Sequence, residues 1–156
     1  MTAARSGNGF QSTAATARSV PSAGSQLLAG TEDTGGRFTL IRSAAPPGDR
    51  TPLHRHAEMD ESFYVLRGNY TVTCGDDVFE VSTGEFVHLP RGMPHKYVAG
   101  PDGGEKLLLG HPGGLEQFFD EWDAGNSDVH DIGSRHGIEF LEQRPSRSKF
   151  RWPIAG

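Results

Sequence analysis

Two histidines and a glutamate stand close together in the segment "LHRHAEMDE", and side chains of these types can bind a metal ion. Side chains on an extended strand alternate between its two faces, so His54 and His56 point the same way and can chelate one ion. Glu61 is separated from His56 by an odd number of positions, which would place it on the opposite face of an unbroken strand. The residues between them must therefore bend. Antiparallel pairing of the next strand with the first would then return the Glu61 carboxylate to the histidines.

A fourth ligand is expected from elsewhere, because open metal sites usually combine several imidazoles with a carboxylate and leave positions for a substrate. His95 is the candidate. It follows "GEFVHLPRGMP", in which two prolines stiffen the loop and Gly92 permits a backbone conformation that would aim the next residues inward. The predicted metal ligands are therefore His54, His56, Glu61 and His95.

Other readings of the same residues stay open. Paired histidines beside acids could form only a charged, solvated turn, and Glu58 or Asp60 could replace Glu61 as the carboxylate ligand. His88 is interpreted as a packed or surface histidine, and Cys74, the single cysteine, as a small strand residue rather than a reactive thiol. No chemical role is predicted for the remaining histidines that lack a spacing relation to these motifs, which are His111, His130 and His136.

The composition limits the class of protein. The 156 residues suit one domain, and the net charge of -5 argues against binding to nucleic acid, which needs clustered lysine and arginine. A lone cysteine forms no intramolecular disulfide, so nothing ties the chain to an oxidising compartment. No apolar run approaches the ~20 residues that span a bilayer. We therefore expect no membrane partner and, by default, a cytoplasmic location.

The domain is predicted to span residues 27–144. Residues 1–26 are rich in alanine, serine, threonine and glycine, which is typical of a disordered leader, although a transit peptide shares this composition. Residues 145–156 are predicted to form a loose basic tail, in which Phe150 and Trp152 could dock on a partner subunit.

Segments of strand length alternate with turn signals every eight to twelve residues, which favours an all-β sandwich or barrel. Two short helices are expected near the C-terminal end, Leu115–Trp122 from its apolar spacing and Val129–His136 with Gly137 to end it. The aromatic side chains of the first helix are expected to pack against the outside of the sheet. The expected strands are 38–42, 53–56, 62–66, 70–74, 78–81, 86–89, 95–98 and 106–109.

The chain resembles the cupins. Gly48 to Gly68 fits the first cupin motif at every fixed position, and Gly84 to His95 fits the second. The asparagine that closes the family's second motif falls on Ala99, which removes a polar group but leaves the ligand set intact. Residues 27–141 are similar to small single-domain cupins of the quercetinase-like group. The resemblance implies a jelly-roll β-barrel, a divalent metal held by His54, His56, Glu61 and His95, and usually a homodimer.

The substrate pocket is expected on the inward strand faces beside the metal. Its predicted walls are Phe63 and Val65 next to Glu61, Phe86 after the turn at Gly84, and Tyr97 after His95. Apolar and aromatic walls suit a planar organic ligand. The same side chains could instead be ordinary barrel core, since a small jelly roll must fill its interior.

The quercetinase-like resemblance implies a dioxygenase that acts on an enolic or phenolic, flavonol-like or polyketide-like, small molecule. Glu61 would take the substrate's hydroxyl proton or stay bound to the metal. A redox-neutral isomerase, decarboxylase or polyketide cyclase could use the same site, and a small-ligand-binding cupin without catalysis is a further reading. The metal could be Fe, Mn, Ni, Co, Cu or Zn, and its identity does not follow from these ligand types.

Overall fold

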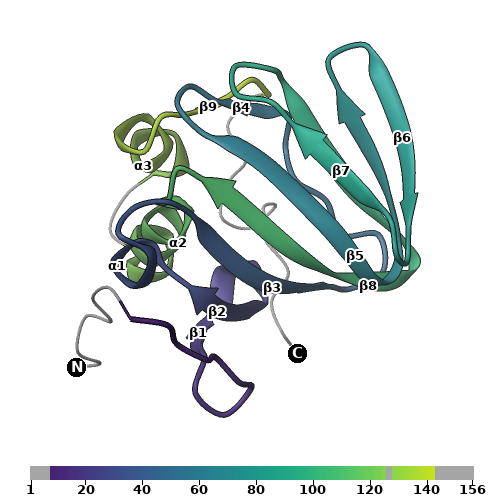
Figure 1. Cartoon of the computed structure of the whole chain (residues 1–156). Helices are drawn as coiled ribbons and strands as arrows, with labels where there is room; N and C mark the ends of the chain where they lie inside the picture. The colour runs from purple at the N-terminus through teal and green to yellow at the C-terminus, as the bar shows by residue number, and fades with distance from the viewer. Residues whose placement is uncertain (1–7, 126–127, 143–156) are drawn as a thin grey trace.

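The computed structural model describes residues 8–125 and 128–142. Strands dominate this part of the chain and form an antiparallel, jelly-roll-like arrangement (Figure 1), so the all-β prediction is confirmed. The strands are β1 (Arg18–Val20), β2 (Ser25–Ala29), β3 (Thr39–Ala45), β4 (His54–His56), β5 (Asp60–Cys74), β6 (Asp77–Ser82), β7 (Phe86–Leu89), β8 (His95–His111) and β9 (Ile138–Phe140). The helices are α1 (Thr31–Thr34), α2 (Leu115–Ala124) and α3 (Val129–Arg135), with a 3-10 turn η1 at Pro21–Ala23.

Strands β5 and β8 are two long antiparallel partners that carry most of the barrel. The sequence analysis expected separate strands at 62–66 and 70–74, with a turn at Gly68–Asn69, and at 95–98 and 106–109, with a break in "AGPDGG" (residues 99–104). Both breaks are wrong. The strands bend at these places instead, with register shifts in β5 on either side of Gly68. Gly68 has a φ of 76°, and a Cβ there would lie 2.2 Å from the Gly103 carbonyl oxygen, so only glycine permits the strands to turn this corner together.

An N-terminal hairpin adds an edge to the sheet. β1 pairs with β2, and β2 pairs with β3. The Arg18 guanidinium makes two hydrogen bonds to the Asp120 carboxylate, at 2.7 and 3.1 Å, which tie β1 to helix α2. The expectation of a disordered leader through residue 26 is therefore wrong for this hairpin. The predicted basic tail, residues 145–156, lies outside the described residues.

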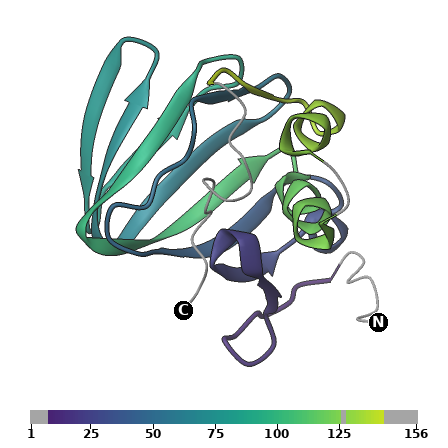
Figure 2. The same ribbon diagram turned by 180° about the vertical axis from the view of Figure 1, so that it is seen from behind.

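The three helices lie together at one end of the molecule, and the β5–β6 hairpin lies at the other (Figures 1 and 2). The predicted helix at residues 115–122 is confirmed as α2, and the prediction for 129–136 is confirmed as α3. Gly137, with a φ of 69°, follows α3 in the left-handed conformation that commonly ends a helix. Among the described residues, no helix is both long and apolar enough to cross a bilayer.

The buried carboxylate of Glu116 fixes α2 to the sheet. It accepts hydrogen bonds from the Thr31 backbone N–H at 2.5 Å and from the Thr39 hydroxyl. Burial alone would raise the pKa of Glu116, but these hydrogen bonds outweigh it and lower the pKa below its usual value. The apolar face of α2 is thereby held over the open end of the barrel, where the metal-ligand candidates lie.

Candidate metal centre

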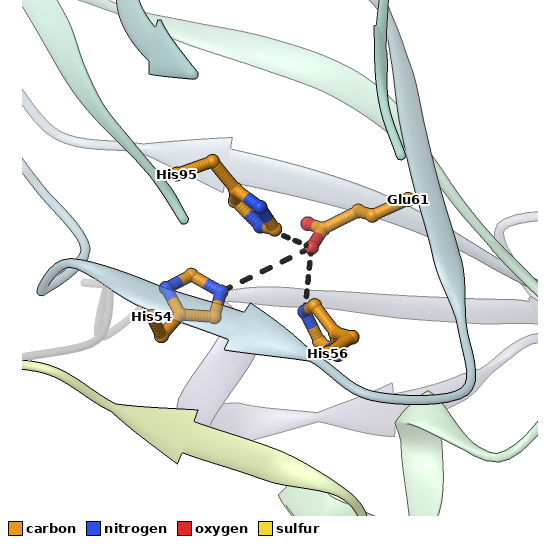
Figure 3. A group of neighbouring side chains, drawn as sticks. All are labelled: His54, His56, Glu61 and His95. Atoms are coloured by element: carbon orange, nitrogen blue, oxygen red, sulfur yellow. Dashed lines mark hydrogen bonds and ion pairs between the residues drawn. The ribbon is translucent and has the colours of Figure 1, made fainter. Parts of the chain in front are cut away.

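The four predicted ligands come together inside the barrel (Figure 3). His54 and His56 lie on β4, Glu61 lies near the start of β5, and His95 begins β8. All four side chains are buried, and one potential ligand atom from each falls within 4.8 Å of all the others. Paired histidines in a merely solvated turn would be exposed, so the geometry argues against that alternative.

The short strand β4 is held in position by two neighbouring strands, β8 and β9. His54 stands opposite His95 in the pairing with β8, and on the other edge all three residues of β4 pair with β9. The chain does bend after His56, as predicted, at Ala57 and Glu58. The predicted pairing of β4 with the next strand is wrong, however. β5 pairs with β6, β7 and β8, so β8, which also pairs with β4, connects Glu61 to the histidines.

The Glu61 carboxylate lies at the centre of the cluster. Its Oε2 atom is 2.9 Å from His56 Nε2, 3.0 Å from His95 Nε2 and 4.0 Å from His54 Nε2. The dashed lines in Figure 3 mark these contacts. Three ring nitrogens and one carboxylate oxygen thus converge on a single point, which is the arrangement that an ion bound by nitrogen and oxygen ligands requires.

Backbone carbonyls orient two of the rings. The Nδ1 atom of His54 lies 2.8 Å from the Pro52 carbonyl oxygen, and the Nδ1 atom of His95 lies 3.1 Å from the Met93 carbonyl oxygen. A carbonyl only accepts hydrogen bonds, so Nδ1 carries the proton in both rings. Their Nε2 atoms are then directed into the cluster, as in metal sites whose histidines are held by a second hydrogen bond.

The charges of the cluster suit metal binding. Burial, followed by the neighbouring His95 and His56, lowers the pKa of His54 to about 3, so this imidazole is neutral at pH 7. Burial alone would raise the pKa of Glu61, but the contacts with His56 and His95 lower it well below its usual value. An ionised carboxylate next to the neutral His54 imidazole suits a metal ligand set. Burial would lower the pKa of His95, but its contacts with Glu61 raise that pKa, so a metal ion bound there would displace a proton.

His56 provides the test of whether a metal fits. Both of its ring nitrogens are buried, and among the described residues neither has a hydrogen bond of acceptable geometry, although Nε2 is close to Glu61. A buried polar atom without a partner is costly. A metal ion bound by His56 Nε2 would remove that cost at this atom, so the residues present fit a metal.

The alternative ligands lie elsewhere. Asp60 is engaged by Arg91, whose backbone and side-chain nitrogens lie 2.8 and 3.2 Å from one carboxylate oxygen. Glu58 is exposed. His88 is exposed on the outer face of β7, where it shares a 2.8 Å hydrogen bond with the Ser62 hydroxyl, so of the two readings, packed or surface histidine, the second is correct. None of the three belongs to the cluster.

A pocket opens beside the metal-ligand candidates, with a cavity volume of about 20 Å³. Of the four predicted wall residues, Tyr97 lines it. Phe63 and Val65 are buried in the barrel core and do not line it. Phe86 is 63% exposed, because β7 turns Val87 and Leu89 inward, so its assignment to the pocket is wrong. The pocket walls are Ser43, Thr51, His54, His56, Glu61, Tyr97, Leu108, Leu115, Phe118, Phe119, Ile138 and Phe140.

Sequence reasoning missed the side of the pocket that faces the helices. Phe118 and Phe119 are 1% and 2% exposed and line the pocket, whereas they were expected on the outside of the sheet. β9 supplies Phe140, whose ring centroid is 5.9 Å from that of His54. The apolar spacing of α2 was visible in the sequence. β9 was not predicted, because only three residues form this strand and so short a segment shows no clear alternation of apolar and polar residues.

Comparisons with known proteins agree with this geometry. Residues 42–109 match the family described as cupin domain. Quercetin 2,3-dioxygenase of Bacillus subtilis is 30% identical over 94 residues, which are 60% of this chain and 28% of that protein. An uncharacterized Methanocaldococcus jannaschii protein is 34% identical over 62 residues, 40% of this chain and 50% of that protein. The chain thus spans half or less of the length of these two curated relatives.

Solved structures show the same fold. An RmlC-like cupin from Shewanella frigidimarina superposes with a TM-score of 0.59 at 18% identity, covering 71% of this chain and 96% of that one. KdgF from Halomonas superposes with a TM-score of 0.51 at 23% identity, covering 60% and 84%. Motif spacing, ligand geometry and fold therefore all agree with the match of residues 42–109 to the cupin domain family.

Proposed function

We propose that this protein is a metal-dependent dioxygenase that acts on an enolic or phenolic small molecule. One observation carries the proposal: a buried cluster of three histidines and one ionised glutamate opens into a pocket with aromatic walls. Such walls suit a planar organic ligand. The similarity to quercetin 2,3-dioxygenase supports the same reaction class, with the substrate left open.

The metal would be held by His54, His56, Glu61 and His95. When bound, it would supply Lewis acidity toward the substrate's oxygen atom and, if Fe, Mn, Ni, Co or Cu, redox chemistry toward dioxygen. Zinc would supply Lewis acidity alone. The buried aromatic residues Phe118 and Phe119 would exclude water and hold the substrate ring against the cluster.

Glu61 is assigned the proton-transfer role. Its carboxylate is ionised, is 6% exposed, and lies both in the cluster and on the pocket wall. A substrate hydroxyl seated there would come within hydrogen-bond reach of the carboxylate, which accepts its proton and leaves the substrate as an enolate or phenolate. The anion is the electron-rich form that dioxygen oxidises, and both atoms of O₂ pass into the product, so no further reductant is required.

The experiment is oxygen uptake by the metal-loaded protein with a panel of flavonols and enolic polyketide-type phenols. We expect uptake in proportion to substrate consumed, and a loss of ~100-fold or more in kcat for Glu61→Gln when its metal content is matched to that of the wild-type protein. Glu121→Gln, an exposed carboxylate change on α2, is the matched control and should keep full activity. Substrate conversion under strict anaerobiosis would refute the dioxygenase and indicate the redox-neutral class, whereas ligand recovered unchanged would indicate a binding protein.

The assembly and boundaries of the domain are part of the proposal. We infer a domain over residues 27–144, extended at its N-terminal edge by the β1–β2 hairpin, and a homodimer as in many cupins. Light scattering of the purified chain at several concentrations tests the dimer, and a mass of one chain throughout would contradict it.

A further inference from the structure

A lysine is buried in the middle of the barrel. Lys106 has no exposed surface, although β8 around it was predicted to be an apolar strand. It takes its place in the inward row of β8 between Gly104 and Leu108. Lysine is almost never fully buried without a charged partner. Among the described residues, no carboxylate comes within ion-pair distance of its ammonium group. Packing alone therefore does not explain why a charged side chain is buried at this position.

Aromatic rings surround the Lys106 ammonium group. Its Nζ atom lies 4.1 Å from the centroid of the Tyr97 ring, 4.8 Å from that of Tyr70 and 5.7 Å from that of Phe63. The ring faces offer cation–π attraction, which stabilises a cation without neutralising it. One hydrogen bond, donated to the Ser43 hydroxyl at 3.5 Å, is long. The positive charge is therefore held in place but remains uncompensated by any contacting anion.

This charge lies directly behind the pocket wall. Tyr97 and Ser43, which contact Lys106, both line the pocket beside the metal-ligand candidates. Burial lowers the pKa of Lys106 to about 8, and the carboxylates of Glu61 and Asp49 act against this lowering. The side chain is thus mainly protonated at pH 7. In an interior of low dielectric constant, its field reaches a ligand in the pocket with little screening.

We propose that Lys106 makes the pocket selective for anionic ligands, so that a carboxylate, enolate or phenolate binds there in preference to its neutral isostere. The inference rests on the proposed use of this pocket as the substrate site and narrows the substrate class to compounds that carry or acquire a negative charge. Lys106 acts across Tyr97 and Ser43 rather than by touching the ligand. It is a positioning residue. Burying its charge without a contacting anion costs free energy, and an anion that enters the pocket would offset part of this cost.

The test compares benzoate with benzamide, two probes of nearly equal shape and different charge, on the zinc-loaded protein by calorimetric titration. Lys106→Met keeps the length and apolar stem of the side chain and removes its charge. Lys96→Met is the matched control, since Lys96 is a partly exposed lysine on the same strand, paired with Glu142 at 3.5 Å. We expect Lys106→Met to weaken benzoate binding at least ~10-fold and to leave benzamide binding within about twofold, and we expect Lys96→Met to change neither.

Equal weakening of both probes by Lys106→Met, or no change in either, would overturn the proposal, as would a wild-type protein that binds benzoate no more tightly than benzamide. Zinc content and circular dichroism establish that each variant is folded and loaded. If Lys106→Met fails to fold, wild-type protein labelled with ¹³C at lysine Cε decides the matter. The pKa of Lys106 must then rise when benzoate binds and stay constant with benzamide, and a constant pKa with both refutes the proposal. None of these measurements depends on oxygen chemistry, so a failed oxygen-uptake experiment leaves the result interpretable.

Discussion

His54 and His95 stand directly opposite each other in the β4–β8 pair, with their ring centroids 4.4 Å apart. The sheet register, rather than the local sequence, therefore brings the two halves of the metal site together. His54 arrives from the first cupin motif and His95 from the second, and a shift of one residue in this pairing would turn one of the rings out of the barrel.

Removing either ring should abolish tight metal binding. For His54→Ala and His95→Ala we expect metal affinity to fall by more than ~100-fold, because the loss of a direct ligand exceeds the ~10–100-fold cost of losing a residue that only orients one. Competition with a chelator of known affinity measures the change. His88→Ala, which alters an exposed histidine on β7, is the control. One metal per chain retained at wild-type affinity in either ligand variant would contradict the proposed site.

Helix α2 should depend on its buried carboxylate. Glu116→Gln weakens two hydrogen bonds to a charged acceptor, from Thr31 and Thr39, so the free energy of unfolding should fall by about 1–2 kcal/mol at pH 7. Because the folded-state pKa of Glu116 is lowered, this contribution is present above the unfolded-state pKa and is lost as pH falls through the folded-state value. Urea unfolding of both proteins between pH 7 and pH 3 should therefore show the difference shrinking in acid. A difference that grows in acid would be inconsistent with this role.

Asp49 should have the opposite pH dependence. Burial is the largest influence on this carboxyl group and raises its pKa to about 6, while Lys106 and the Arg50 N–H act against the rise. A raised folded-state pKa means that stability is fully present below the unfolded-state pKa of 3.8 and is lost as pH rises through about 6. Asp49→Asn should therefore stabilise the protein at pH 7 by about 1 kcal/mol, since partial exposure screens the charge, and should have no effect near pH 4. Thermal or urea unfolding of the variant and the wild-type protein at the two pH values measures this difference in stability. An Asp49→Asn protein less stable than wild type at pH 7 would show that the charge of Asp49 is favourable.

The two faces of the sheet should respond differently to substitution. Phe63→Ala removes a fully buried ring and should cost about 3–5 kcal/mol in unfolding free energy. Phe86→Ser changes a ring that is 63% exposed and should alter that free energy by less than ~0.5 kcal/mol, with no effect on ligand binding. Denaturant unfolding gives both values. A large loss in Phe86→Ser would mean that the outer face of β7 is covered, for example by a second copy of the chain.

The metal ligands could be predicted because short motifs carry them. Two histidines on one face of a strand, a nearby glutamate and a histidine after a proline-stiffened loop are local signals, and the resemblance to the cupin motifs fixed which residues to join. The strand breaks at Gly68–Asn69 and in "AGPDGG" were predicted wrongly for a physical reason. Glycine permits a sharp turn but equally permits two strands to approach and bend together, and only the tertiary contact between Gly68 and Gly103 decides between them.

The pocket could be predicted only in part. Phe86 was placed inside because strand alternation gives two faces but not which face is inward, and Val87 takes that place. Lys106 was missed because a charged residue in a strand is normally exposed. Phe118 and Phe119 were recognised as the apolar face of a helix, yet the sequence does not state which surface of the barrel that helix covers.

Because β4 pairs with β9, the strand that flanks two of the candidate metal ligands is synthesised long after the ligands themselves. His54 and His56 leave the ribosome early, but the strand that flanks them, Ile138–Phe140, is made more than eighty residues later. Until then, β4 is held by its pairing with β8 at His54–His95 and by the hydrogen bond that the Gly92 N–H donates to the His56 carbonyl at 2.7 Å. The backbone frame around the two histidines is therefore complete only when residues 138–140 have been added to the chain.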